Sequence, residues 1–225
     1  MRFGKIVMLA SLVLVLAGCS RAYDYPEYTT GDRADKEPRL TTAMVTVLPD
    51  GAGGFYFKLG GEKLKPRGYT PSVHGRAMCE LLIYPNEGSG DEYKLADVRW
   101  FEPIDEGSFT YNASAPGADG IDVDVSSWVT EACDGYLTIY YSTWWGEHPV
   151  HHDFYLVAGL DPADPYSLEL RQDSHSDDHF ERSDGIICFD INTLPQTDGR
   201  QTLTLNWTRT DGRRSAAKFE FETFK

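Results

Sequence analysis

The stretch YLTIYYSTWW, residues 136–145, carries the alternation on which the fold assignment depends. Successive side chains of a strand point to opposite faces, so Leu137, Ile139 and Tyr141 would all point inward. Similar short runs, rich in β-branched and aromatic residues, occur on both sides of it, and Gly, Pro, Asn and Asp separate them. Beyond the N-terminal apolar run, no segment carries a sustained helical period. The sequence therefore predicts an all-β fold.

The C-terminal half contains seven such runs at the spacing typical of a β-sandwich. Turn signals such as DPADP (161–165) and TDGR (197–200) separate them. We therefore expect residues 113–225 to form a β-sandwich domain. The runs are 121–125, 136–142, 150–157, 166–172, 185–191, 202–207 and 217–224.

The N-terminal half contains five shorter runs, and the first two flank PDGAG (49–53), which is typical of a hairpin turn. Five strands in about 70 residues favour a small closed barrel. We expect an OB-like β-barrel domain over residues 37–112. The turn-rich stretch NASAPGADG (112–120) then marks the domain boundary. The five runs are 43–48, 54–59, 76–84, 92–98 and 99–104.

The N-terminus has the pattern of a secretory signal, with Arg2 and Lys5 before an apolar run over residues 6–17. The run is about a dozen residues long, whereas a membrane-spanning helix needs about 20. It ends in LAGC (16–19), which resembles the bacterial lipobox, where the cysteine is lipidated and the chain is cut before it. We expect residues 1–18 to be a lipoprotein signal peptide and Cys19 to carry the lipid anchor. An ordinary signal peptide with an incidental cysteine is the alternative.

Residues 19–36 are polar and lack an apolar period, which predicts a flexible tether between lipid and domain. Ser20 follows the lipidated cysteine, so the chain lacks an inner-membrane retention signal of the Asp type. We therefore expect a lipid-anchored protein of the cell envelope, at the outer membrane.

The chain is strongly acidic, with 35 acidic and 21 basic residues and a net charge of −14. Removal of residues 1–18 takes away two basic and no acidic residues, which makes the charge −16. This charge opposes a phosphate backbone, so we expect no nucleic-acid partner. Contact with the membrane must come from the N-terminal lipid.

Three cysteines remain after lipidation of Cys19, so at most one disulfide can form. Cys79 alternates with Ala77 and Leu81 on the apolar face of a predicted strand, and we expect it to be buried. Cys133 and Cys188 could pair in an oxidising envelope, although nothing in their spacing requires it. The sequence leaves this disulfide open.

No motif in the sequence points to catalysis. The chain lacks a Gly-x-Ser-x-Gly elbow and a His-Glu-x-x-His helix. The Gly-rich stretches 51–54 and 60–61 fit hairpin turns better than phosphate loops, because no helix follows them. We therefore expect no catalytic residues, no enzymatic activity and no cofactor.

Two groups of histidines suggest a metal site, because imidazole and carboxylate groups together can bind zinc. Strand geometry places His151 and His152 on opposite faces, and the Ser and Asp residues of the second group favour a loop. We therefore predict no metal site. The groups are His148, His151 and His152, and His175 and His179 with Asp177 and Asp178.

Trp144, Trp145 and His148 are the candidate ligand-binding residues. The two indoles lie at or beyond the end of their strand, and Pro149 limits the freedom of the following segment. Exposed tryptophans can stack on sugars or anchor a protein partner. Alternatively, both indoles plug the open end of the sandwich.

Several of these segments resemble the NigD-like lipoproteins of Bacteroidetes-type bacteria. The match in the first half is GFYFKLGGEKLKP (54–66). In the second half it consists of DGYLTIYY (134–141), HHDFYLV (151–157), LELRQDSHSDD (168–178) and GIICFDINTL (185–194). This chain has Cys188 where a Ser is common in the family, and its loop over residues 173–184 is long.

The resemblance implies an N-terminal OB-type domain followed by a C-terminal β-sandwich. The family is named after a bacteriocin locus, which points to immunity or another interaction in the envelope, and no catalytic residues carry over. We expect a lipid-anchored envelope protein with a non-catalytic binding or bacteriocin-immunity-like role, whose partner is an envelope protein or a glycan. A carbohydrate-recognition lipoprotein of a glycan-uptake system is the alternative.

Overall fold

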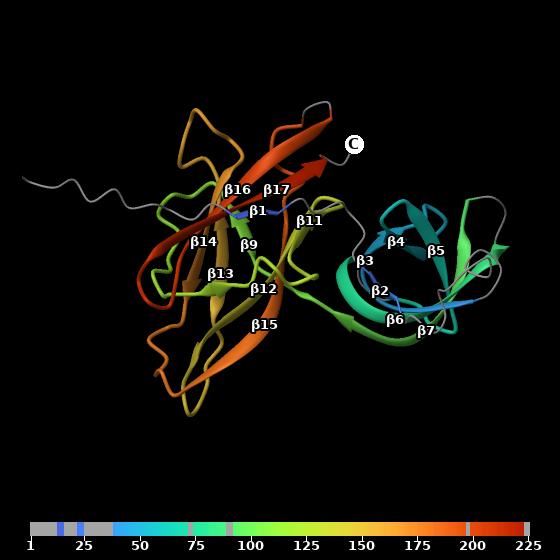
Figure 1. Cartoon of the computed structure of the whole chain (residues 1–225), viewed down its shortest axis with the longest axis horizontal. Coiled ribbons are helices and arrows are strands. Elements are labelled where there is room, and N and C mark those ends of the chain that lie inside the picture. Colours follow the sequence, from blue (N-terminus) through green and yellow to red (C-terminus); the bar gives the residue numbers. More distant parts are fainter. Residues whose placement is uncertain are drawn as a thin grey trace, which may run out of the picture.

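The computed structural model describes residues 13–15, 22–24, 38–71, 74–88, 92–196 and 199–222. Every regular element in these ranges is a β-strand, and the strands form two bodies that lie side by side (Figure 1). The all-β fold predicted from the sequence is confirmed. Across the same ranges, no helix is long and apolar enough to cross a membrane.

The N-terminal body is a closed five-stranded barrel. The strands lie in the order β3-β4-β5-β7-β6, and β6 pairs back onto β3 to close it. β5 and β7 pair in parallel, whereas the other neighbours are antiparallel. This is the OB-like barrel that the sequence predicts. Its strands are β3 (Arg39–Pro49), β4 (Phe55–Leu59), β5 (Glu62–Arg67), β6 (Gly75–Gly88) and β7 (Lys94–Pro103).

Apolar side chains at alternate positions fill the barrel. Ala43, Val45 and Val47 of β3 are buried, and Phe57 and Leu64 from the neighbouring strands pack against the same core. The predicted burial of Cys79 is also confirmed. The alternation in the sequence therefore identifies the inner face of the barrel.

Two of the expected barrel strands differ from those observed. The sequence analysis does not identify β5, because this strand is mostly charged, contains Pro66 and places only Leu64 in the core. Residues 92–98 and 99–104, expected as two strands, instead form the single strand β7. Glu80 pairs with Trp100 and Leu81 with Val98, so Arg99 is a bulge that breaks the alternation.

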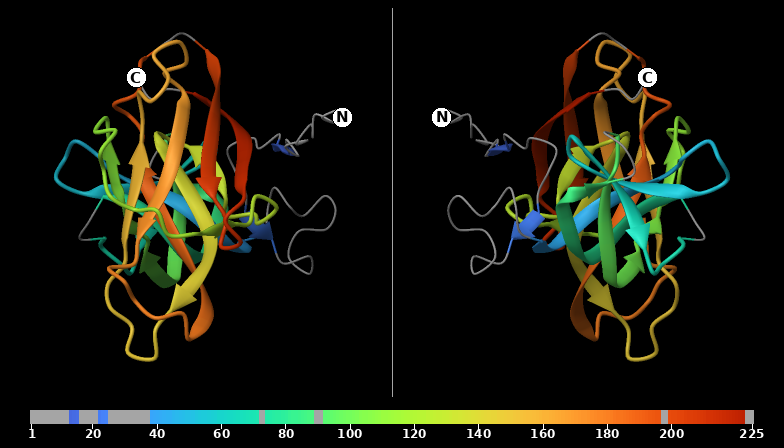
Figure 2. Two further views of the ribbon diagram at one scale, coloured as in Figure 1. Left: turned by 90° about the vertical axis from the view of Figure 1, so that its left-hand side faces the viewer. Right: turned by 90° about the vertical axis from the view of Figure 1, so that its right-hand side faces the viewer.

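The C-terminal body is a sandwich of two sheets, which Figure 2 shows from its outer side on the left. One sheet has the order β17-β16-β14-β13-β9, and the other has the order β10-β12-β15-β8 with β11 also paired to β12. All seven predicted sandwich strands are present. The strands are β8 (Asp105–Glu106), β9 (Ser108–Thr110), β10 (Asp122–Val123), β11 (Glu131–Cys133), β12 (Tyr136–Trp145), β13 (Asp153–Val157), β14 (Ser167–Asp173), β15 (Glu181–Asp190), β16 (Arg200–Thr208) and β17 (Arg214–Glu222).

The sandwich core lies between these two sheets. Leu137, Ile139 and Tyr141 of β12 are buried in it, as their alternation predicts. Phe189 of β15 and Phe219 of β17 pack into the same cluster. Burial of side chains this large contributes about 1.5–3 kcal/mol each to stability.

Most of the predicted signal peptide and tether, including Cys19, lies outside the described residues. Two short strands are the exceptions. β1 (Val13–Val15) runs parallel to β17, and β2 (Ala22–Asp24) runs antiparallel to β3. Cleavage before Cys19 would remove β1 and leave β17 at the edge of its sheet.

The chain passes from barrel to sandwich before the expected boundary at residue 112. The Ile104 N–H still donates to the Arg76 carbonyl in the barrel, at 2.9 Å, whereas the Gly107 N–H donates to the Cys188 carbonyl in the sandwich, at 2.8 Å. β8 and β9 pair in parallel with β15 and β13. Residues 105–110 therefore belong to the sandwich sheets, and we propose a domain division near residue 104.

A buried ion pair joins the two bodies. The guanidinium of Arg76 donates to Glu131 Oε1 at 2.5 Å, to Thr46 Oγ1 at 2.7 Å and to Thr138 Oγ1 at 3.2 Å. The side chains of Arg76 and Glu131 are only 1% and 3% exposed. Arg76 therefore binds groups of both bodies at once.

A second polar contact lies beside this ion pair. Asp134, in the turn between β11 and β12, accepts a hydrogen bond from Thr46 at 3.1 Å and forms an ion pair with Lys58 at 2.6 Å. Its side chain is 5% exposed. The joint between the bodies is thus polar, buried and paired, which favours one relative orientation of barrel and sandwich.

The three described cysteines are free thiols. Cys133 in β11 and Cys188 in β15 pair with residues on opposite sides of β12, so a whole strand separates them. Two strand spacings amount to about 9–10 Å, which exceeds the Cα separation of about 7 Å that a disulfide can bridge. The geometry therefore excludes the disulfide that the sequence left open.

The pairing of β8 and β9 predicts where the sandwich can be cut. We expect a fragment spanning residues 105–225 to fold and to melt at a higher temperature than one spanning 113–225, because only the longer fragment keeps both strands. Thermal melts and the dispersion of amide NMR signals measure this. Equal melting temperatures would place the boundary back near residue 112.

The buried ion pair predicts that replacing one partner alone destabilises the protein far more than replacing both. Arg76→Met leaves Glu131 buried without its counter-charge and should lower the free energy of unfolding by about 3–5 kcal/mol. Arg76→Met combined with Glu131→Met should recover most of this loss, because no buried charge remains. Denaturant unfolding measures both. Arg67→Met is the control, since the Arg67–Asp97 pair is exposed and should matter little. A single variant as stable as the parent would contradict the structural importance of the pair.

Candidate functional site

The candidate site lies at the end of the sandwich, where the β12–β13 turn and the β14–β15 loop project together (Figure 1, yellow and orange loops at the lower edge). We call this end the aromatic tip and define it by Trp144, Trp145, His152, His179 and Phe180. The first two residues end β12, and the others belong to the two loops. The tip therefore combines segments that are distant in the sequence.

The two tryptophans of β12 have different roles because they point to opposite faces. Trp145 continues the inward series of Tyr141 and Thr143, and its indole stacks on the imidazole of His152 with centroids 3.9 Å apart and planes 4° apart. His152 is 1% exposed. Trp145 thus packs over a buried residue at the open end of the sandwich.

Hydrogen bonds fix the buried imidazole on both sides. The Gln172 amide donates to His152 Nδ1 at 2.7 Å, so the ring carries its hydrogen on Nε2, which faces Asp177 Oδ2 at 3.1 Å. Both ring nitrogens are therefore occupied, and Trp145 covers one face of the ring. This arrangement suits a structural histidine rather than one that exchanges a proton with a substrate.

Asp177 connects the two loops. Its Oδ2 accepts the Gly146 N–H at 2.9 Å and contacts His152. The Gly146 N–H, followed by His152, holds the pKa of Asp177 below its ordinary value. A Cβ atom at position 146 would lie 2.1 Å from Asp177 Oδ1, so any larger residue there would displace the carboxylate. One carboxylate therefore holds the β12–β13 turn against the β14–β15 loop.

The outer face of the tip presents partly open aromatic groups. Trp144 stacks on His179 with centroids 5.9 Å apart, and the Arg182 guanidinium lies 5.9 Å from the indole centroid. Phe180 is 62% exposed and Val150 is 45% exposed. The two loops of the tip therefore expose large apolar side chains to solvent.

The other histidines are separate from the two indoles. His148 is exposed in the β12–β13 turn, and within the described part of the chain it forms no hydrogen bond, ion pair or ring contact. His151 and His152 lie before β13 rather than on a strand, and they differ in burial: the side chain of His151 is 87% exposed, whereas His152 is buried. His175 contacts Asp153 at 2.9 Å. Among the described residues, no group of three or more His, Cys, Asp or Glu side chains is arranged to hold a metal ion.

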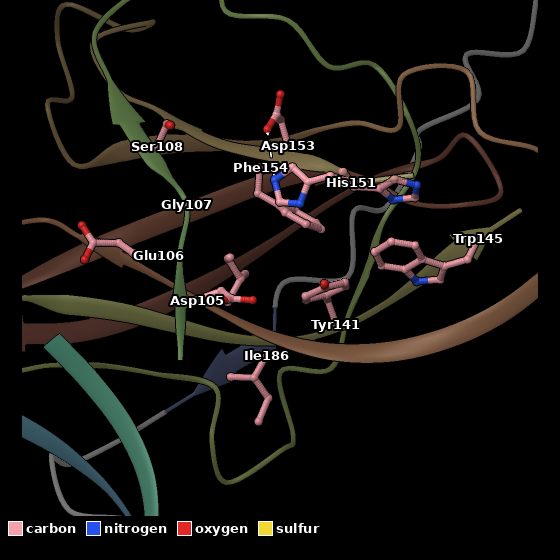
Figure 3. Close-up of a pocket in the computed structure, with 12 residues that line it drawn as sticks. Asp105, Glu106, Gly107, Ser108, Tyr141, Trp145, His151, Asp153, Phe154 and Ile186 are labelled. Carbon is pink, nitrogen blue, oxygen red and sulfur yellow. Dashed lines mark ion pairs between the residues drawn. The ribbon is translucent and has the colours of Figure 1, made fainter. Parts of the chain in front are cut away.

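A cavity of about 160 Å³ opens beside Trp145, between β12, β13, β15 and the β8–β9 crossing (Figure 3). Its lining includes Asp105, Tyr141, Trp145, Asp153 and Phe154. Apart from Trp145, sequence reasoning did not connect these residues with a site. They come from different strands, and the alternation indicates only that Tyr141 points inward.

The fold and the site can now be compared with known proteins. Residues 102–221 match the model of the NigD-like C-terminal β-sandwich domain. The chain belongs to the NigD-like family. This match begins close to the chain's passage from barrel to sandwich, and it includes the whole aromatic tip. No curated protein matches the chain.

Solved structures of proteins from Parabacteroides and Bacteroides species share the architecture of this NigD-like protein. One is a Parabacteroides distasonis protein provisionally described as toxin-related, 27% identical, with a TM-score of 0.66 over 82% of this chain and 94% of that one. Another is a Bacteroides caccae NigD-like immunity protein, 18% identical, with a TM-score of 0.50 over 79% and 90% of the two chains. A third is a Bacteroides fragilis protein provisionally described as a lipoprotein, 13% identical, with a TM-score of 0.55 over 83% and 98%.

The Asp177 contacts predict an acid-sensitive tip. The folded pKa of Asp177 is depressed, so its contribution is fully present above the ordinary pKa of about 3.9 and is lost as the pH falls through the lower folded value. We therefore expect Asp177→Asn to lower the melting temperature near neutral pH and to match the parent in strong acid. Melts across this pH range measure the difference. Asp178→Asn, an exposed neighbour, is the control, and a pH-independent gap would contradict this role.

Proposed function

We propose that this protein is a lipid-anchored protein of the cell envelope with a non-catalytic, immunity-like binding role, and that its partner docks on the aromatic tip. The main support for the proposal is that the tip presents aromatic side chains next to two loops that hydrogen bonds hold together. Trp144 lies at the end of β12 and the exposed Phe180 lies on the β14–β15 loop, and the contacts of Asp177 with Gly146 and His152 hold the two loops of the tip together. Aromatic side chains on a preorganised surface bind with little loss of conformational entropy.

The relatives support the immunity-like part of the proposal. The Bacteroides caccae relative is described as a NigD-like immunity protein, and the Parabacteroides distasonis relative is provisionally linked to a toxin. An immunity protein acts by binding another macromolecule, which agrees with a tip built for contact.

The envelope part rests on the N-terminal sequence, with its apolar run and LAGC (16–19). A lipid on Cys19, with Ser20 after it, would place the protein at the outer membrane. The Bacteroides fragilis relative, provisionally described as a lipoprotein, supports the lipid anchor.

A protein partner suits the outer face better than a glycan. Sugars stack on open aromatic faces, whereas His179 and Arg182 both lie against the indole of Trp144. The exposed phenyl ring of Phe180 is instead the kind of apolar anchor that enters a pocket on a partner protein. A glycan array tests the carbohydrate alternative directly.

The tip predicts separable effects on binding and stability. Trp144→Ala and Phe180→Ala should abolish capture of a partner from envelope extract while changing the melting temperature little, because these side chains are largely exposed or lie on the outer face. Trp145→Ala should lower the melting temperature clearly, because its indole covers His152. Crosslinked pull-downs and melts of the same variants measure both effects.

Tyr111→Ala is the matched control for these variants. Tyr111 is an exposed aromatic residue at the opposite end of β13, 54% exposed, beyond the point where β9 pairs with Val157. The Tyr111→Ala substitution should leave capture of the partner unchanged. Undiminished capture by stable Trp144→Ala and Phe180→Ala variants would reject the aromatic tip as the docking surface.

The lipid anchor predicts that Cys19→Ala abolishes labelling of the protein by a fatty-acid probe and leaves the signal peptide uncut. Cys79→Ala is the control, because that thiol is buried in the barrel and should not affect labelling. Metabolic labelling followed by gel electrophoresis measures the result. A Cys19→Ala protein that is still labelled would contradict the anchor.

A further inference from the structure

The cavity beside Trp145 has the size of a small ligand site. Its volume is about 160 Å³, and apolar cavities of about 150 Å³ accommodate a benzene ring. The end of a long side chain or a small organic molecule would therefore fit. The cavity also adjoins the aromatic tip, because Trp145 belongs to both.

Aromatic rings line much of the cavity. The rings of Tyr141 and Phe154 lie 4.8 Å apart at an interplanar angle of 50°, and Trp145 stands next to them (Figure 3). Gly185 lies opposite Tyr141 in β15. A Cβ atom there would come within 2.6 Å of the phenol oxygen, so a larger residue at this position would collide with the Tyr141 ring. Aromatic faces attract cations through their quadrupole. The walls therefore favour a positively charged guest over a negatively charged one.

Three acidic residues line the cavity, namely Asp105, Glu106 and Asp153. Figure 3 shows the Asp105 carboxylate directed toward Tyr141, and Asp153 lies on the opposite side. Within the described residues Asp105 has no hydrogen bond or ion pair, and no lysine or arginine lines the cavity. Among the described residues, the ionic neighbours of Asp153 are the imidazoles of His151, at 3.4 Å, and His175, at 2.9 Å. Asp105 is exposed to solvent, so its carboxylate is open to a cation that enters from outside.

The hydroxyl of Tyr141 is a second polar group that the cavity offers to a ligand. Tyr141 is 6% exposed and lines the cavity, yet among the described residues its hydroxyl has no hydrogen-bond partner. The hydroxyl oxygen itself is not fully buried but opens into the cavity, where a guest can form a hydrogen bond with it. Burial, and then the nearby Asp105, raise the pKa of Tyr141 to about 12, so the neutral phenol is available to accept a hydrogen bond.

We propose that this cavity receives an organic cation, namely the ammonium or guanidinium end of a basic side chain presented by the partner of the aromatic tip. The cation would donate to Asp105 and to the Tyr141 oxygen, and its alkyl stem would pack against Phe154 and Trp145. The proposal rests on the proposed function for the source of the cation. The net charge of −14 would also attract a basic partner.

The test uses the purified full-length chain and small probes. N-acetyl-lysine amide and N-acetyl-arginine amide represent a side chain of a partner, n-butylammonium represents a free amine, and N-acetyl-norleucine amide is the uncharged control. Tryptophan fluorescence and calorimetric titration measure binding. We expect saturable binding of the cations, weakened by salt, and no binding of the norleucine amide. Tighter binding of the peptide-like amides than of butylammonium would favour a partner side chain over a free amine.

Two variants separate binding from folding. Tyr141→Phe removes only the unpaired hydroxyl, so it should keep the melting temperature and weaken cation binding by about tenfold. Asp105→Asn should weaken binding by at least as much, because it removes the charge. Asp178→Asn, outside the cavity, is the matched control. Absence of cation binding, equal binding of norleucine amide, or unchanged affinity in both variants would overturn the proposal.

The failure of this proposal is distinguishable from failure of the proposed function. If no cation binds but partner capture still depends on Phe180, the cavity proposal is wrong and the docking surface stands. If cations bind as described but Phe180→Ala and Trp144→Ala leave capture intact, the docking surface is wrong and the cavity remains a cation site. Tighter binding of Ca²⁺ than of any organic cation would also overturn the proposal, in favour of a metal site.

Discussion

The guanidinium of Arg76 holds the barrel and the sandwich together, because it donates at once to Thr46 in the barrel and to Glu131 and Thr138 in the sandwich. Removing these charges from water is costly unless every donor finds an acceptor, and here the acceptors come from both bodies. The two bodies therefore have one well-paired relative orientation. If the barrel shifted by a few ångströms, Arg76 and Glu131 would lose each other as partners and would remain buried as unpaired charges.

Strand β12 connects this joint to the aromatic tip at the other end of the sandwich. It begins next to the joint at Tyr136, passes Thr138, which binds Arg76, and ends about 30 Å away at Trp145. Its inward residues build the core, then one wall of the cavity, and finally the stack on His152. On its outward face, the residues near Tyr136 face the barrel, and the residues near Trp145 face solvent. One alternating strand thus supports the joint, the cavity and the aromatic tip.

The sequence predicts elements best where alternation is regular and one face is buried. β12 and β16 satisfy both conditions and are identified directly. β5 is missed because its charged side chains give it a single core residue, and the two expected strands within β7 arise from a bulge at Arg99. β8 and β9 are too short to show a period, so they indicate no sheet until their partners β15 and β13 are known.

The sequence by itself determined the fold class, the order of the two bodies and the inward face of β12, because these follow from local periodicity and turn chemistry. It also singled out Trp144, Trp145 and His148, but as one group. Tertiary structure separated them: Trp145 packs on His152, Trp144 faces outward, and His148 stands apart. It also brought Asp177 to Gly146 and Asp105 to Tyr141, pairs that are 31 and 36 positions apart. Such contacts depend on how sheets close and loops meet, which no local pattern encodes.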